Sequence, residues 1–521
     1  MTPQKSEKPV VPKDLRKSVP TRHEEDSDEG GKGFPVEEAL RRQGLLFATA
    51  ESARSKRAPH SARRRDLSRR KATRGPKAKH KTCTHAAATL KGVIESLDEA
   101  LDKIEANDGA PGPDRQSVCA VRKHWRTIRS KLAQDLLTGR FQPGDIRRVW
   151  IAKPGGGQRG LGIPNVVDRV VQEAVRAVLE PLFEPTFHAS SHGFRPNRSC
   201  HTAIHEAASY IQDGYNWVVD IDLEKFFDRV NHQRLQARLA TRVTDQSLLT
   251  LIGHMLKAKV VMPDGVRQSI DEGVPQGGPL SPLLSNIVLH ELDEELAQRG
   301  LRFVRYADDC NIYVRSPRAG ERVMASVTRF IEGRLRLKVN AAKSAVARPE
   351  TRHFLGFRFQ PRAGQGPEIL LSERSEKRLR ERIRELTPRN SGNSLRAMIE
   401  RINRYLVGWD GFFRLCTPGA ERVLAAADAH LRRRLRGCLL KHWKRRRTIV
   451  KHLIRLGARP TTAWARIYEG RKSLWALSHA PVVDRALPNA YFAAQGLVSL
   501  RTRAQARWAE QVAPKQLSLP W

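Results

Sequence analysis

Two acidic segments carry the residues in this sequence that are best suited to chemistry. In the first, Asp308 and Asp309 lie at a turn between two apolar runs, residues 301–304 and 312–314, that favour β-strands. Because side chains alternate along a strand, a carboxylate pair at the tip of a hairpin can be aimed at one point. Adjacent acids are also common in solvated turns, so this pair alone is weak evidence.

The second acidic segment covers residues 217–228 and is expected to form a strand that ends in an acidic turn, with Asp222 near its end. Three carboxylates from two neighbouring strands provide the hard oxygen ligands that Mg²⁺ prefers. Two such ions stabilise the attacking and leaving oxygens of an in-line phosphoryl transfer. The pattern indicates nucleotidyl transfer. Asp220 would face the same side of an ideal strand, so spacing alone does not choose between Asp220 and Asp222.

Eight segments between about residue 90 and the mid-480s resemble, in the same order, those of group II intron-encoded reverse transcriptases and maturases of the bacterial type. They comprise residues 106–114, 148–159, 191–196, the Asp222 segment, 273–282, the Asp308 hairpin, 337–343 and 354–357. The interval from Asp222 to Asp228, matched to the family pattern, selects Asp222 over Asp220. The resemblance implies an RNA-directed DNA polymerase that also binds its intron RNA and assists splicing.

The resemblance also implies an α+β fold shaped like a right hand. Fingers and palm are expected over residues 86–371, and an α-helical thumb, domain X, over residues 372–485. Residues 1–85 are expected to be a disordered basic arm, because they hold too few large apolar residues to offset the entropy of ordering. Residues 486–521 are expected to be a short basic tail. No cysteine follows Cys438, so the family's optional endonuclease is predicted to be absent.

Site residues are carried over from the family to matching positions. Asp222, Asp308, Asp309 and the backbone carbonyl of Leu223 are expected to bind two Mg²⁺ ions, with Mn²⁺ as an alternative. The expected contacts to the deoxynucleotide come from the residues Lys153, Arg159, Phe227, Gln276 and Lys343.

Three of these positions need comment. Phe227 is expected to block a 2′-hydroxyl, whereas Phe226 is the expected core residue. Lys343 is either a proton donor to pyrophosphate or an ordinary surface lysine. Gly160 stands where the family usually has proline after the arginine, which could loosen the tip of the fingers.

The composition points to a polyanionic partner. The chain has 94 Lys and Arg against 55 Asp and Glu, which gives a net charge of +39 and a pI near 10.8. We expect nucleic acid to neutralise this charge, with salt-dependent binding. A membrane is not expected, because no apolar run approaches the roughly 20 residues of a spanning helix. The RNA-contacting residues are expected in two groups of arginines: Arg63, Arg64 and Arg65 in the arm, and Arg432, Arg433, Arg434, Arg445, Arg446 and Arg447 in the thumb.

The remaining elements follow from periodicity. Apolar residues recur every three or four positions from Leu90 to Ile104, and helices are also expected over residues 120–137, 166–183 and 200–211. Residues 145–163 are expected to form a hairpin. A short helix over residues 36–47 is possible from the pattern, and residues 35–50 could equally be a leader remnant. Six scattered cysteines and the lack of a signal core predict a reduced, cytoplasmic protein, with association with the nucleoid as the alternative.

The predicted function is therefore reverse transcription of intron RNA, with intron RNA, the DNA target or primer, and deoxynucleotides as partners. Two alternatives stay open: a non-catalytic RNA-binding splicing maturase, and a domesticated reverse transcriptase, for example one in host defence.

Overall fold

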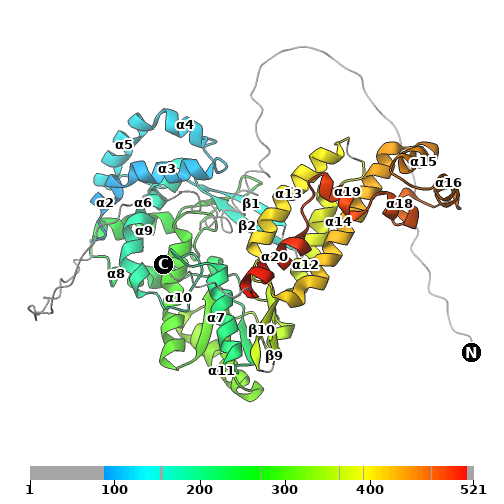
Figure 1. The fold of residues 1–521 in the computed structure, drawn as a ribbon. Coiled ribbons are helices and arrows are strands. Elements are labelled where there is room, and N and C mark those ends of the chain that lie inside the picture. Colours follow the sequence, from blue (N-terminus) through cyan, green and yellow to red (C-terminus); the bar gives the residue numbers. More distant parts are fainter. Residues whose placement is uncertain are drawn as a thin grey trace, which may run out of the picture.

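The computed structural model describes residues 87–152, 157–269, 271–362, 364–390, 392–470 and 472–512, which form a mixed α+β fold (Figure 1). The predicted arm, its helix at 36–47 and Arg63, Arg64 and Arg65 lie outside the described residues. The described helices include no segment both long enough and apolar enough to cross a membrane.

Within the described residues ten strands form three sheets, with the orders β2-β1-β4-β5, β6-β7-β3-β8 and β10-β9. The strands are β1 (Ile146–Ala152), β2 (Gln158–Ile163), β3 (Trp217–Ile221), β4 (Val260–Val261), β5 (Arg267–Gln268), β6 (Arg302–Tyr306), β7 (Asp309–Val314), β8 (Ala345–Ala347), β9 (Phe357–Arg362) and β10 (Gln365–Leu371). The predicted hairpin over residues 145–163 is the antiparallel pair of β1 and β2.

The helices fall into an N-terminal and a C-terminal group (Figure 1). The N-terminal group is α2 (Leu90–Glu95), α3 (Leu97–Asn107), α4 (Val118–Lys123), α5 (Trp125–Leu137), α6 (Val166–Phe183), α7 (Cys200–Gln212), α8 (His232–Ala240), α9 (Gln246–Leu256), α10 (Ser281–Gln298) and α11 (Pro317–Phe330). The C-terminal helices are α12 (Glu373–Leu386), α13 (Leu395–Phe412), α14 (Glu421–Trp443), α15 (Arg446–Arg455), α16 (Pro460–Tyr468), α17 (Leu474–Leu477), α18 (Pro481–Ala486), α19 (Asn489–Ala494) and α20 (Leu500–Val512).

Two predicted helices are each divided in two. The apolar stripe from Leu90 is interrupted at Ser96, whose hydroxyl donates to the Gly92 carbonyl at 2.8 Å and so satisfies it locally. The helix predicted over residues 120–137 begins at Val118 and changes direction at His124, where φ and ψ are −103° and 13°. The helix predicted over residues 166–183 is α6, with the same bounds.

In the sheet β6-β7-β3-β8, the strands β3, β6 and β7 are largely buried on both faces, and β8 at the edge is half-buried. One face, which includes Val219 and Ile312, belongs to an apolar cluster shared with α6, α8, α9 and α10. The opposite face, which includes Val218 and Tyr313, belongs to a second cluster. The period-2 alternation of strands therefore divides the sheet's side chains between two cores.

The second cluster extends from the sheet through β9 and β10 into the C-terminal helices. It includes Ile402 of α13, Leu435 of α14 and Trp508 of α20. The tail predicted over residues 486–521 is corrected here: through Val512 it forms α19 and α20, because Leu500, Ala504 and Trp508 are buried against the other helices. Basic residues at 501–507 lie between these apolar residues, so the sequence is dominated by charge and its helical apolar spacing is easily overlooked.

Candidate active site

The acidic residues lie at one end of β3 and β7. These strands pair antiparallel, with Asp220 opposite Asn311 and Ile221 opposite Cys310. The next position of that register places Asp222 opposite Asp309. Directly opposed residues on one face of a sheet have Cβ atoms about 5 Å apart. The backbone therefore directs Asp222 and Asp309 to the same face, at the edge where β3 ends.

Asp308 lies in the tight turn between β6 and β7. Because Tyr306 pairs with Asp309, only Ala307 and Asp308 form the loop. Ala307 has φ +57°, and a positive φ at the first of two turn residues is the type II′ pattern. A Cβ on Gly193 would come within 2.3 Å of the Ala307 nitrogen. Glycine at 193 therefore allows its backbone to lie directly against this strained turn.

A buried arginine, Arg305, holds the turn in position through hydrogen bonds. Arg305 is 0% exposed and pairs through two hydrogen bonds, of 2.7 and 2.6 Å, with Asp293, which is also 0% exposed. Its remaining N–H groups donate to Asn286 Oδ1 at 3.0 Å, to the Ala307 carbonyl at 2.9 Å and to Ser191 Oγ at 2.7 Å. All five donors of the guanidinium are used. This network fixes the position of the turn that carries Asp308.

The carboxylates influence one another strongly. Desolvation by the surrounding protein, together with the negative charges of Asp308, Asp220 and Asp222, raises the pKa of Asp309 to about 7. Solvent reaches the Asp309 side chain, so we give the repulsion between carboxylates more weight than desolvation. Burial also raises the pKa of Asp308, while nearby Arg159 lowers it. Such mutual repulsion is the electrostatic condition that a bound cation would relieve.

Asp220 and Asp222 have different cationic partners. Arg352 donates to Asp220 Oδ2 through Nε at 2.9 Å and through Nη2, and it also donates to the Lys343 carbonyl. Lys343 Nζ lies 3.1 Å from Asp222 Oδ2, with 67% of the lysine side chain exposed. The planar, half-buried guanidinium of Arg352 is therefore paired with Asp220, whereas the ammonium of Lys343, on a flexible and exposed side chain, is paired with Asp222.

The hairpin residues reach toward this site from the other sheet. Arg159 Nε donates to Gln276 Oε1 at 2.8 Å, and the Gly162 amide donates to the Gln276 carbonyl at 2.7 Å. Gly277 has φ +119°, and a Cβ there would meet the Gly162 carbonyl at 2.5 Å. The glycine loop thus closes on β2 and holds Arg159 close enough to influence Asp308. Lys153 lies outside the described residues.

Phe227 and Leu223 occupy the loop after β3. Phe227 is 8% exposed in the short 3-10 helix Phe226–Asp228, and its carbonyl accepts from the Val274 amide. Leu223 bridges Val339, and the hydrogen bonds on either side run from the amides of Glu224 and Asn340. This is a non-hydrogen-bonded pair, so the Leu223 carbonyl points away from the 338–340 segment.

The donor set fits a hard divalent cation in kind, since Asp222, Asp308 and Asp309 supply only carboxylate oxygens. In the described part of the chain, however, no three His, Cys, Asp or Glu side chains stand close enough together to hold a metal ion. The ammonium of Lys343 contacts the carboxylate of Asp222 that would face such an ion. The backbone therefore places the three aspartates at one end of the sheet, but their carboxylate groups do not converge on a common point.

The structure separates the arginines expected to contact RNA. Arg434 is only 9% exposed and donates to Thr387 Oγ1 and to the carbonyls of Thr387 and Arg384. Arg446 donates to the carbonyls of Ile467, Gly470 and Lys472. Both side chains stabilise the fold through these hydrogen bonds, and RNA contact by either arginine stays a prediction.

The other four arginines remain accessible to different degrees. The Arg433 guanidinium lies 4.4 Å from the ring centre of Trp475. Arg432 is half-buried beside a hollow between α14 and α19, whereas Arg445 and Arg447 are exposed.

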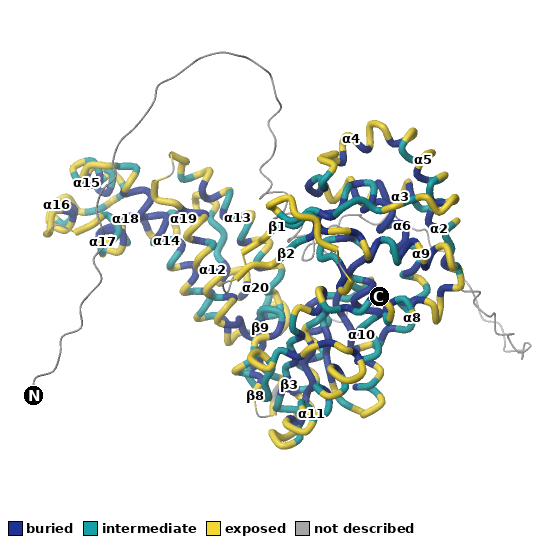
Figure 2. The backbone as a smooth tube through the Cα atoms, turned by 180° about the vertical axis from the view of Figure 1, so that it is seen from behind, coloured by how far each residue is buried: buried dark blue, intermediate teal, exposed yellow. Residues whose placement is uncertain are grey.

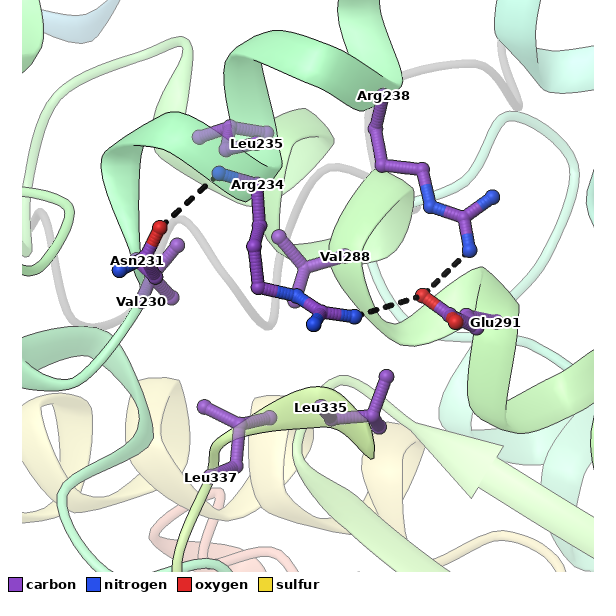
Figure 3. Close-up of a pocket in the computed structure, with 9 residues that line it drawn as sticks. All are labelled: Val230, Asn231, Arg234, Leu235, Arg238, Val288, Glu291, Leu335 and Leu337. Carbon is purple, nitrogen blue, oxygen red and sulfur yellow. Dashed lines mark hydrogen bonds and ion pairs between the residues drawn. The ribbon is translucent and has the colours of Figure 1, made fainter. Parts of the chain in front are cut away.

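A separate pocket lies behind the acidic loop, between α8, α10 and residues 335–337 (Figure 3). Its floor is apolar, and Arg234 and Arg238 on its rim pair with Glu291, as the dashed lines show. Arg334 adds a third contact to the same carboxylate at 3.3 Å. Because Glu291 already engages these cations, the pocket offers no acidic or nucleophilic group comparable to the carboxylates at β3 and β7.

Sequence reasoning missed the roles of Arg305 and Asp293. The motifs considered in the sequence give neither residue a role. An arginine inside an apolar strand run, with an acid on a neighbouring apolar helix at Asp293, is the signal that could have indicated a buried pair.

Comparisons with known proteins agree with this geometry. A family model for reverse transcriptase (RNA-dependent DNA polymerase) matches residues 151–359, and one for the group II intron maturase-specific domain matches residues 376–455. Protein YkfC of Escherichia coli is 32% identical over 292 residues, which cover 48% of this chain and 76% of that protein. Group II intron-encoded protein LtrA of Lactococcus lactis is 41% identical over 176 residues, 34% of this chain and 29% of that protein.

The alignment with LtrA therefore covers less than a third of that protein. A solved structure of a partial Cas6-RT-Cas1–Cas2 complex aligns with 25% identity over 47% of this chain and 42% of that chain, with a TM-score of 0.31. The two family models follow one another along the chain, and the first contains all the carboxylates at β3 and β7. The chain belongs to the group II intron-encoded reverse transcriptases, with a polymerase domain followed by a maturase-specific domain.

Proposed function

We propose that the protein is an RNA-directed DNA polymerase that copies intron RNA into DNA and binds that RNA to assist its splicing. The observation that carries the proposal is the placement of Asp222 and Asp309 on one face at the end of β3 and β7, with Asp308 in the adjoining turn. The membership of the chain in a reverse transcriptase family supports it.

In this proposal Asp222, Asp308, Asp309 and the Leu223 carbonyl hold two Mg²⁺ ions, with Mn²⁺ as a possible substitute. When bound, the ions lower the pKa of the primer 3′-hydroxyl and neutralise charge on the triphosphate. The protein's own contribution is to fix the primer terminus and the nucleotide in line, because phosphoryl transfer depends chiefly on positioning and electrostatics.

Residues around the carboxylates bind the nucleotide. Arg159, oriented by Gln276, offers a planar fork to the phosphates, and Lys153 adds a point charge. Phe227, placed after Asp222 by the 3-10 turn, packs under the sugar and excludes a 2′-hydroxyl. Lys343, once released from Asp222, would turn toward the leaving pyrophosphate and donate a proton to it. Its exposed stem permits that movement.

The right-hand assignment is part of the proposal. We place fingers and palm in residues 86–371, with the β1–β2 hairpin as the fingers and the β6-β7-β3-β8 sheet as the palm. The helices from α12 onward form the thumb, domain X. The folded α19 and α20 extend it beyond residue 485, because α20 packs on the same core as α14. Exposed arginines such as Arg445 and Arg447 then face the RNA.

Primer extension on an RNA template with deoxynucleotides and Mg²⁺ tests the proposal. We expect the wild type to extend the primer, and Asp308→Asn and Asp222→Ala to lose extension by a factor of about 1,000 or more while intron RNA affinity stays within a factor of about two. Asp213→Asn, at an exposed aspartate after α7, is the matched control. No extension by the wild type would favour the rival function, a non-catalytic splicing maturase.

A further inference from the structure

Two aromatic side chains on α16 are left open to solvent. In the described part of the chain, the exposed large apolar residues include three aromatics, Trp150, Trp464 and Tyr468, at 45%, 41% and 47%. Trp464 and Tyr468 lie four residues apart on one helix face, and their rings are stacked with centroids 5.4 Å apart at an angle of 25°. An exposed aromatic pair of this size indicates a surface that binds a ligand.

The orientation of α16 explains why these rings face outward. Ala463 and Ile467 are 0% exposed and join the same core as Leu453 of α15. Trp464 and Tyr468 each follow one of these buried residues, so the packing of the helix turns them to solvent. In Figure 2, α16 lies at the outer end of the C-terminal helices, with a largely yellow tube. Neither ring therefore completes the core of this chain.

The part of the sequence that carries the pair is strongly basic. Residues 444–472 contain a single acid, Glu469, against ten cations: Lys444, Arg445, Arg446, Arg447, Lys451, Arg455, Arg459, Arg466, Arg471 and Lys472. Glu469 is paired with Arg466 and Lys472 at 3.3 and 3.2 Å. The net charge favours a polyanion over an apolar protein segment, which would gain nothing from these cations.

The C-terminal end of α16, next to Tyr468, is fixed by hydrogen bonds. Arg446 donates to three backbone carbonyls, those of Ile467, Gly470 and Lys472, which fixes the end of α16. The same guanidinium lies 6.0 Å from the ring centre of Tyr468. The aromatic pair is therefore held in place before any ligand arrives, which lowers the entropic cost of binding.

We infer that Trp464 and Tyr468 form a stacking platform for unpaired bases of a single-stranded nucleic acid, whose phosphates contact the surrounding lysines and arginines. Aromatic faces bind successive bases with little sequence preference, and a basic groove follows the backbone. Trp464 and Tyr468 lie outside both regions matched by the family models, residues 151–359 and 376–455, whereas the cations from Lys444 to Arg455 lie within the second region. The inference extends the proposed binding of RNA by the C-terminal helices.

The test uses the full-length protein and fluorescence anisotropy with a short single-stranded RNA of mixed sequence. Trp464→Ala and Tyr468→Ala should each weaken binding about tenfold, because stacking on one aromatic ring contributes roughly that factor. The slope of log affinity against log salt should stay unchanged, since neither side chain neutralises a phosphate. Val407→Ala, at an exposed apolar position of α13, is the matched control and should bind like the wild type.

An abasic oligonucleotide with the same backbone isolates the stacking contribution. It should bind the wild type about as weakly as the Trp464→Ala variant binds the intact strand, and the variant should not distinguish the two strands. Trp464→Phe should restore most of the affinity. Equal affinities of wild type and both alanine variants for the intact strand would overturn the inference, as would equal loss for a perfect duplex.

The same variants distinguish this inference from the proposed polymerase. Neither alanine variant should change primer extension on a short primer–template, because α16 lies far from the β6-β7-β3-β8 sheet (Figure 1). If the wild type extends no primer, the polymerase proposal fails while the binding result stands by itself. A fall in the thermal midpoint with unchanged RNA affinity would show that the rings serve packing, and would overturn the inference.

Discussion

Replacing Arg305 by lysine tests how the acidic turn is held in place. Lysine retains the positive charge but has three N–H groups where the guanidinium uses five. At least two of the five hydrogen bonds to Asp293, Asn286, Ala307 and Ser191 must therefore be lost inside a fully buried network. Each buried acceptor left without a donor costs about 1–3 kcal/mol. We expect Arg305→Lys to lower local stability by about 3 kcal/mol.

Hydrogen–deuterium exchange of the peptides that cover β6 and β7 measures this effect where it occurs. The chain contains more than one apolar cluster, so a local measurement is safer than a single global transition. A loss of about 3 kcal/mol corresponds to roughly hundredfold faster exchange. Primer extension should fall in parallel, because the Ala307 carbonyl that positions Asp308 loses its donor.

The control is Arg322→Lys, at an exposed position of α11, where a change within about 0.5 kcal/mol is expected. If Arg305→Lys left the exchange of both strands within threefold of the wild type, the network would not be what holds the turn. Unchanged exchange with reduced extension would refute the stability argument.

Three further predictions concern other parts of the chain. Phe227→Ala should raise ribonucleotide incorporation by about tenfold or more in single-nucleotide extension, whereas Phe226→Leu, in the core, should not; equal sugar selectivity in both would contradict the gate. Deletion of residues 1–80 should weaken RNA binding and flatten its salt dependence, and an unaltered slope would show that these cations do not contact RNA. Burial raises the pKa of Asp168 from 3.8 to about 6, so its contribution to stability is present below pH 4 and is lost as the pH rises through 6. Asp168→Asn should therefore unfold at higher urea than the wild type at pH 7.5, with the difference of up to about 3 kcal/mol disappearing near pH 4.

The strands that carry the carboxylates could be predicted because their signals are local. Apolar alternation marks β3, β6 and β7, and the register then follows from the two-residue turn at Ala307 and Asp308. The family motifs added the choice of Asp222 over Asp220. The structure supplies a physical difference between them, since Arg352 engages Asp220.

Other features depend on partners that are distant in the sequence. Arg434 is buried because its hydrogen-bond partners lie about 50 positions away in the sequence. A run of arginines therefore gives no indication of which one is buried. Trp508 donates to the Cys416 carbonyl at 2.7 Å, and that contact is part of what converts an expected tail into α20. Ser96 ends α2 through its own side chain, which periodicity alone does not detect.

The apolar cluster shared by the β6-β7-β3-β8 sheet and the C-terminal helices has a consequence for how the chain is made. Val218, Val304 and Tyr313 leave the ribosome long before Leu435 and Trp508, the residues that bury the same core. During translation α7 can cover this face early, since the Tyr210 ring lies against that of Tyr313, but the part of the core between α14 and α20 is completed only when nearly the whole chain has emerged. The nascent polypeptide therefore presents the apolar face of α14 to chaperones until the end of its synthesis, and a premature stop codon before α20 would leave that face permanently open.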